Sequence, residues 1–234
     1  KDRRIHLIKA SANFGGPAGP RNIGIKSSTG SFIALLDADD IWRPEKLERI
    51  FSRIKSGHGD IFYHREMRFE NLPGDCSVEI RTSNTSDISN LLFYLLKKGN
   101  IFSPSAIVIR KEILLQELFD EDSSLHGVED FDLWLRLAKK GVLFTFIDEV
   151  LGFYRIHPGG ISRNFRKHGT KERFLLRKVF AKFLPESFPG MFIIGKLKLL
   201  RSIMANMVRS LRYNGLADFS FYLSEALGVL RGKY

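Results

Sequence analysis

The stretch SFIALLDADDIW, residues Ser31–Trp42, decides how the rest of the chain is interpreted. Its apolar run Phe32–Leu36 has the length and bulk of a buried strand, and it ends abruptly at Asp37, Asp39 and Asp40. In an open parallel sheet, ligands bind beyond the carboxyl ends of the strands. These carboxylates therefore fall where a binding site is expected.

Carboxylates packed this closely along the chain repel one another unless a cation or a shifted pKa relieves the repulsion. Mg²⁺ or Mn²⁺ would relieve it, because both prefer oxygen ligands and usually take only one or two carboxylates, with waters and substrate phosphates completing the shell. A solvated acidic turn before the next helix is the alternative, and the motif alone leaves both interpretations open.

The composition fits a globular domain with a sizeable core, since the chain has 234 residues, of which 44% are hydrophobic and 27% charged. The single cysteine, Cys76, excludes an internal disulfide and a multi-cysteine zinc site. We expect no signal peptide, and the most apolar window, Met191–Met207, is interrupted by basic residues. We therefore expect no membrane span.

The net charge of +11 is unevenly distributed. Residues 1–162 hold 22 Lys and Arg against 22 Asp and Glu, whereas residues 163–234 hold 15 against 4. This asymmetry predicts a neutral catalytic or binding body over residues 1–162, a basic region over 163–234, and a boundary near Ser162.

The residues before the acidic stretch predict a strand at Arg4–Lys9, a loop over Asn13–Pro20, and a helix from Pro20 to about Ser28. Arg21 lies in the first turn of that helix. Spare backbone N–H groups and a guanidinium at this position suit a phosphate, although an ordinary junction between loop and helix has the same pattern.

The residues after the acidic stretch predict helices alternating with strands, and hence an α/β fold. The predicted helices lie within 44–57, 86–98 and 127–141, and the predicted strands cover 61–69, 106–109 and 142–147, with a polar loop over 71–86.

Two further groups of polar residues accompany these elements. Glu129 and Asp130 fall in the first turn of a predicted helix, where the helix dipole stabilises carboxylates, and where a carboxylate could also act as a general base. Arg155 and His157 fall in a predicted loop after the strand 142–147. A lone histidine is usually structural, but one beside an arginine could bind a metal or a phosphate.

Four strings in this order, NFGGPAGPRN, LLDADDIWRPEKLE, VEDFDLWLRLAKKG and FYRIHPGGIS, resemble those of the family 2 glycosyltransferases with the GT-A fold. The resemblance covers about residues 4–162. It implies a mixed sheet flanked by helices, and transfer of a sugar from a nucleotide-diphosphate donor to an acceptor hydroxyl, usually with inversion and with Mg²⁺ or Mn²⁺. The family's first strand and its base-reading acidic residue would precede Lys1.

The resemblance also implies roles for individual side chains. Asp37 and Asp39 match the DxD pair that contacts the donor and its metal, with Asp39 expected to bind the metal directly. Asp130 is the expected general base, and His157 is expected to complete the metal or diphosphate site. The arginines expected to assist at the phosphates are Arg21 and Arg155, with an internal salt bridge as the equal alternative at either position.

The region from about residue 164 to 234 is helical in pattern, with basic residues interleaved among apolar ones. Such helices suit an anionic membrane surface, and packing on the domain with a solvated basic face is the alternative. No nucleic-acid recognition motif is present in the sequence. We expect a cytoplasmic protein, peripheral at the inner face of the membrane.

Three functions are compatible with these patterns. The first is a metal-dependent inverting glycosyltransferase that adds a sugar to a glycan or lipid-linked acceptor in cell-surface polysaccharide or glycolipid assembly. The second is a non-catalytic GT-A remnant that acts as a binding or assembly module, which the missing first strands favour. The third is a nucleotidyltransferase, in which attack occurs at phosphorus and pyrophosphate is released.

Overall fold

The computed structural model describes residues 2–57, 59–71, 77–80, 84–86, 88–157, 165–183, 196–197, 199–205, 207–208 and 219–231. The chain divides into two compact units, one comprising residues 1–123 and 129–157 and the other comprising residues 124–128 and 158–234. The boundary predicted near Ser162 falls within residues 158–164, which lie outside the described residues.

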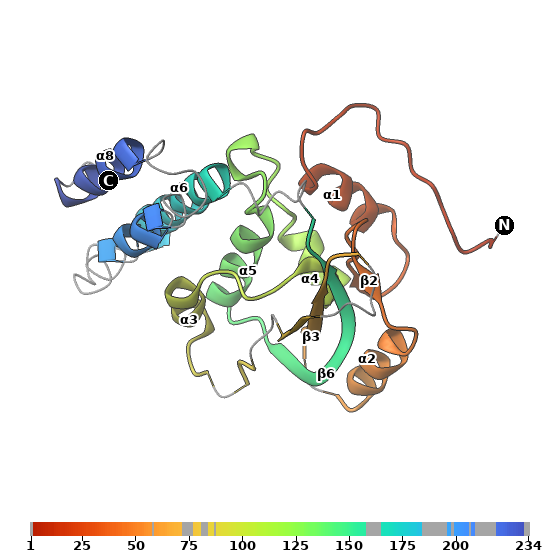
Figure 1. The fold of residues 1–234 in the computed structure, drawn as a ribbon. Helices are drawn as coiled ribbons and strands as arrows, with labels where there is room; N and C mark the ends of the chain where they lie inside the picture. Colours follow the sequence, from red (N-terminus) through yellow and green to blue (C-terminus); the bar gives the residue numbers. More distant parts are fainter. Residues whose placement is uncertain are drawn as a thin grey trace. The chain divides into compact units, whose positions relative to one another are not determined.

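A mixed sheet forms the centre of the first unit (Figure 1). Its strands are β1 (Phe32–Ala34), β2 (Ile41–Trp42), β3 (Ile61–Phe69), β4 (Ser77–Ile80), β5 (Ile107–Arg110) and β6 (Phe144–Arg155). The order across the sheet is β1-β5-β3-β6-β2, and β4 pairs with β3 beyond the end of β5. Only β3 and β6 run parallel, and every other described pairing is antiparallel.

Strand β6 is longer than the sequence predicts. The expected strand over 142–147 continues to Arg155, because β6 pairs with β3 from Ile61↔Phe144 to Phe69↔Arg155. Register shifts in this pairing accommodate Asp148 and Glu149, which are exposed. The prediction that Arg155 lies in a loop is therefore wrong: it is the last residue of β6, and His157 follows two residues later.

The helices of the first unit are α1 (Ala18–Ser27), α2 (Lys46–Lys55), α3 (Leu91–Lys98), α4 (Lys111–Gln116) and α5 (Glu129–Lys139). Ile50 of α2 packs with Phe62 of β3 on one face of the sheet. The neighbouring Tyr63 points to the opposite face, where Phe102 contacts both Tyr63 and Trp134 of α5. Figure 1 accordingly shows α2 on one side of the sheet and α3 and α5 on the other.

The strand predicted at Arg4–Lys9 is not formed. Residues 2–17 run as an extended arm without helix or strand, and Ile5 and Leu7 are 77% and 84% exposed (Figure 1). A strand needs a partner for its backbone N–H and C=O groups, and no described strand pairs with this segment. The sequence analysis also missed β2, α4 and β4, the last of which lies in the predicted polar loop over 71–86.

The second unit contains α6 (Phe165–Phe183), helical residues between 196 and 208, and α8 (Phe219–Leu230). The guanidinium of Arg173 in α6 is buried and donates to Glu225 of α8 over 3.3 Å. Among the described residues, no helix has both the length and the apolar character needed to cross a bilayer.

Candidate functional site

The acidic turn, Asp37–Asp40, lies between β1 and β2. Its first carboxylate, Asp37, accepts a hydrogen bond from Arg21 Nη2 over 2.5 Å. The turn is closed by a backbone bond from the N–H of Asp40 to the carbonyl of Asp37. The three aspartates of the turn consequently diverge, and each contacts a different part of the first unit.

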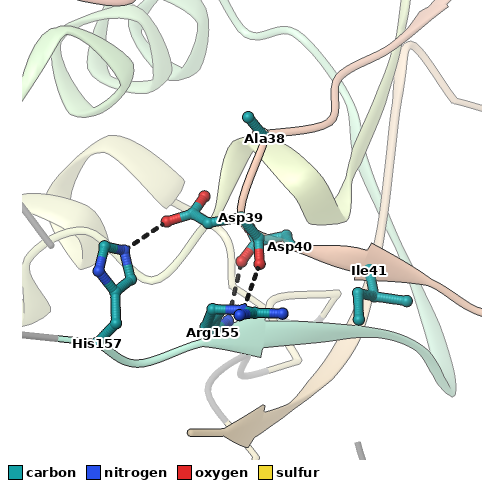
Figure 2. A pocket seen from close by; sticks show the side chains of 6 residues that line it. All are labelled: Ala38, Asp39, Asp40, Ile41, Arg155 and His157. Carbon is teal, nitrogen blue, oxygen red and sulfur yellow. Dashed lines mark hydrogen bonds and ion pairs between the residues drawn. The ribbon is translucent and has the colours of Figure 1, made fainter. Parts of the chain in front are cut away.

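Asp39 points into an open cavity of about 450 Å³ (Figure 2). Its Oδ2 lies 3.0 Å from Nε2 of His157, and both side chains are substantially exposed, at 47% and 37%. Arg155 and Asp40 also line this cavity. The structure therefore brings the predicted residues Asp39, His157 and Arg155 together at one opening.

Asp40 supports the turn from below. Its Oδ1 accepts the backbone N–H of Arg155 over 2.9 Å, and Arg155 Nε donates to the carbonyl of Asp39 over 3.1 Å. Burial raises the pKa of Asp40 to about 6, although hydrogen bonds from Ser105 and Arg155 oppose this effect. The end of β6 thus holds the turn in place from one side.

Arg21 connects the turn to a second group of carboxylates. While Nη2 contacts Asp37, Nη1 donates to Oε1 of Glu129 over 2.8 Å. Burial lowers the pKa of Arg21, but the charges of Asp37, Glu129 and Asp130 offset it, and the net pKa is raised. Arg21 is only 14% exposed, so in this arrangement its guanidinium binds carboxylates of the protein itself.

Glu129 and Asp130 occupy different environments although they are adjacent in α5. Glu129 is buried in its ion pair with Arg21. Asp130 accepts hydrogen bonds from Nδ2 of Asn100 over 2.8 Å and from the N–H of Phe131 over 2.7 Å. Burial, followed by repulsion from Glu129, raises the pKa of Asp130 to about 6. Such a carboxylate takes up a proton near neutral pH.

The sequence analysis missed the buried polar residues behind the turn. Lys46, His64, Glu66 and Ser105 are all fully or almost fully buried within the first unit. Burial lowers the pKa of Lys46 to about 7 and that of His64 to about 3. In the sequence, Lys46 stands out only as a member of the string LLDADDIWRPEKLE, and neither strand periodicity nor local charge distinguishes the other three residues.

Asp39 and His157 offer two donor atoms of the kinds that divalent cations bind. Among the described residues, no three His, Cys, Asp or Glu side chains gather closely enough to form a metal site by themselves. Mg²⁺ and Mn²⁺ nevertheless bind with one or two protein ligands where waters and phosphates complete the shell. An exposed carboxylate and an imidazole nitrogen 3.0 Å apart at an open cavity fit that requirement.

Comparisons with known proteins identify the family of the chain. The family model described as glycosyl transferase family 2 matches residues 1–117, which is half of the chain. The chain belongs to glycosyl transferase family 2. The prediction of this family from the sequence motifs is confirmed, as is the GT-A fold with its mixed sheet.

The relatives include the amylovoran biosynthesis glycosyltransferase of Erwinia amylovora, 30% identical over 158 residues, or 65% of this chain and 51% of that protein. The chain spans about half the length of this relative, and it spans 52% of the length of a second relative.

Two solved structures share the fold. TarS of S. aureus, in complex with UDP-GlcNAc, is 16% identical with a TM-score of 0.58 over 96% of this chain and 63% of that chain. The mannosyltransferase PcManGT of Pyrobaculum calidifontis, in complex with GDP-Man and Mn²⁺, is 14% identical with a TM-score of 0.53 over 95% and 63%.

Proposed function

We propose that this chain carries the transferase site of an enzyme that moves a sugar from a nucleotide-diphosphate donor to an acceptor hydroxyl, with inversion. The observation that carries the proposal is that two carboxylates, Asp39 and Asp130, lie in different environments. Asp39 is exposed beside His157 at the cavity, whereas Asp130 is held where its pKa is raised to about 6.

The Asp39 group acts on the donor side. Asp39 and His157 would hold Mg²⁺ or Mn²⁺, Asp37 two residues earlier would contact the donor, and Arg155 at the cavity would contact the diphosphate. The bound cation would neutralise negative charge on the departing diphosphate. PcManGT, which shares the fold and whose structure is a complex with GDP-Man and Mn²⁺, supports this assignment.

The Asp130 group acts on the acceptor side. As the bond from the anomeric carbon to the diphosphate oxygen breaks, the acceptor oxygen bonds to that carbon and its proton passes to the Asp130 carboxylate. Asn100 and the N–H of Phe131 orient this carboxylate. Glu129 is already committed to Arg21, which favours Asp130 over Glu129 as the base.

The test is a transfer assay with a panel of nucleotide-diphosphate sugars and Mn²⁺, in which the nucleotide product and the anomeric configuration are identified. We expect release of a nucleoside diphosphate and an inverted linkage. Asp39→Asn and Asp130→Asn should each lower kcat/KM by at least about 100-fold, the usual contribution of a general base being 10²–10⁴-fold.

The matched control is Asp148→Asn, which removes an exposed carboxylate of β6 that pairs with Arg65 of β3 and should leave transfer unchanged. Release of pyrophosphate would establish a nucleotidyltransferase instead. A folded chain that neither binds nor turns over any donor would favour a non-catalytic binding module.

We further propose that the second unit docks on an anionic membrane, next to a lipid-linked or glycan acceptor at the inner face. Leu223, Leu227 and Leu230 recur at helical spacing along α8 and are 44%, 40% and 66% exposed. Residues 163–234 hold 15 Lys and Arg against 4 Asp and Glu. An exposed apolar stripe on a strongly cationic region is typical of binding at an interface.

A second stripe supports the same proposal. Leu197, Met204 and Val208 are 60%, 57% and 61% exposed, and the exposed Arg201 lies between them at helical spacing. Basic residues near an anionic bilayer contribute about 1 kcal/mol each. The relative from Erwinia amylovora is named as a glycosyltransferase of amylovoran biosynthesis, which supports a glycan acceptor.

A further inference from the structure

Ser105 contacts both ends of the acidic turn. It lies in the short 3₁₀ turn η2 (Pro104–Ala106) before β5 and is 1% exposed. Its hydroxyl accepts the backbone N–H of Asp37 over 3.0 Å, and its carbonyl accepts Nε1 of Trp42 over 2.9 Å. One buried residue therefore fixes the first residue of the turn and the strand that ends it.

Ser105 is itself held rigidly. The hydroxyl of Ser103 accepts the N–H of Ser105 over 3.2 Å, and the carbonyl of Ser103 accepts the N–H of Ala106 over 3.0 Å. The Ser103 hydroxyl also lies 3.4 Å from Oε1 of the buried Glu66 in β3. Ser103 thus links Ser105 to Glu66 in β3, the central strand of the sheet.

Lys46 strengthens the same contact. Its ammonium donates to the carbonyl of Ser105 over 2.6 Å and lies 3.9 Å from the centre of the Trp42 ring. The side chain is fully buried. Burial lowers the pKa of the ammonium, and the charges of Glu66 and Asp40 oppose this lowering. A buried ammonium generally costs folding free energy unless it is well paired, so apolar packing alone does not account for a lysine here.

We propose that Ser105 and Lys46 are positioning residues that hold the backbone of the acidic turn, so that Asp39 faces the cavity and His157. Like charges along the turn repel, and without these contacts Asp37 and Trp42 lose the partners that oppose this repulsion. The inference rests on the proposed function, because the turn is taken as the donor and metal site.

The test is a titration of Mn²⁺ into the full chain, with free Mn²⁺ followed by electron paramagnetic resonance, beside the transfer assay. Loss of a residue that orients a metal ligand typically costs 10- to 100-fold in affinity. We expect Ser105→Ala and Lys46→Met each to raise the dissociation constant for Mn²⁺ by about 10-fold or more. Ser105→Thr, which keeps the hydroxyl, should restore binding.

The matched control is Thr85→Val, which removes a buried hydroxyl that bonds Tyr63 away from the turn. It should lower the melting temperature without changing Mn²⁺ affinity. A purely structural role for Ser105 would give the same pattern in Ser105→Ala, and that result would overturn the inference. If the unaltered chain binds no Mn²⁺ and transfers no sugar, the proposed function itself is wrong.

Discussion

Arg21 shows how a single side chain can organise both halves of the site. It joins Asp37 and Glu129, from which it is separated by 16 and 108 residues in the sequence. The sequence predicted a phosphate contact for Arg21, and that role stays a prediction. The geometry adds a structural role, because the guanidinium pairs with Glu129. The neighbouring Asp130 has a raised pKa.

The raised pKa of Asp130 predicts an acid limb in the activity. Because the base must be ionised, kcat/KM of the unaltered chain should fall about tenfold per pH unit below about pH 6, where the carboxyl becomes protonated. The pH profile of transfer under saturating Mn²⁺ measures this. A profile that stays flat down to pH 5 would show that a different group removes the proton.

The same shift predicts the sign of a stability change. The folded pKa of Asp130, about 6, lies above the unfolded value of roughly 3.9, so the native state binds more protons between these values. The free energy of unfolding contributed by this group therefore falls as pH rises through that window. Asp130→Asn should gain about 1 kcal/mol relative to the unaltered chain between pH 5 and pH 8 in urea unfolding.

At the scale of elements, the site depends on the pairing of β2 with β6. Gly152 of β6 pairs with Trp42, at the end of the acidic turn. A Cβ added at Gly152 would lie 3.2 Å from Cε1 of the buried His64 and 3.4 Å from the carbonyl oxygen of Ile41. A side chain at residue 152 would therefore crowd His64 and the backbone of β2, next to the acidic turn.

This crowding predicts a contrast between two alanine substitutions. Gly152→Ala should lower the free energy of unfolding by about 1–3 kcal/mol, because the added methyl group would press on the fully buried His64. Gly24→Ala is the control, since no atom lies within 4 Å of its added Cβ in α1. It should be neutral or stabilising by up to about 1 kcal/mol. Equal effects in urea unfolding would contradict this account of β6.

Whole-molecule organisation was predictable only where the signal was local. The apolar run before Asp37 and the helical spacing after Pro44 predicted β1 and α2, and the motifs predicted the family. Ser105 could not be found in this way, because its function depends on contacts to Asp37 and Trp42, 68 and 63 residues away. The predicted strand over 142–147 is shorter than β6, because the charged residues Asp148 and Glu149 resemble the end of a strand.

The proposed membrane contact makes a prediction for the whole chain. Leu223→Ser with Leu227→Ser should reduce sedimentation with phosphatidylglycerol vesicles several-fold, because each removes exposed apolar area from the stripe. The matched control, Leu47→Ser with Leu143→Ser, alters leucines that are 53% and 51% exposed in the first unit. Equal losses in both variants, or equal binding to neutral phosphatidylcholine, would contradict the proposal that the second unit binds anionic membranes.

In the proposed mechanism, the Asp39 carboxylate acts on the donor and the Asp130 carboxylate acts on the acceptor. The most direct measurement is calorimetric titration of a nucleoside diphosphate panel with Mn²⁺ into the unaltered chain, Asp39→Asn and Asp130→Asn. We predict that Asp130→Asn binds the preferred nucleotide as tightly as the unaltered chain, whereas Asp39→Asn loses Mn²⁺-dependent binding. Equal binding by both variants, or equal loss in both, would contradict this division of roles.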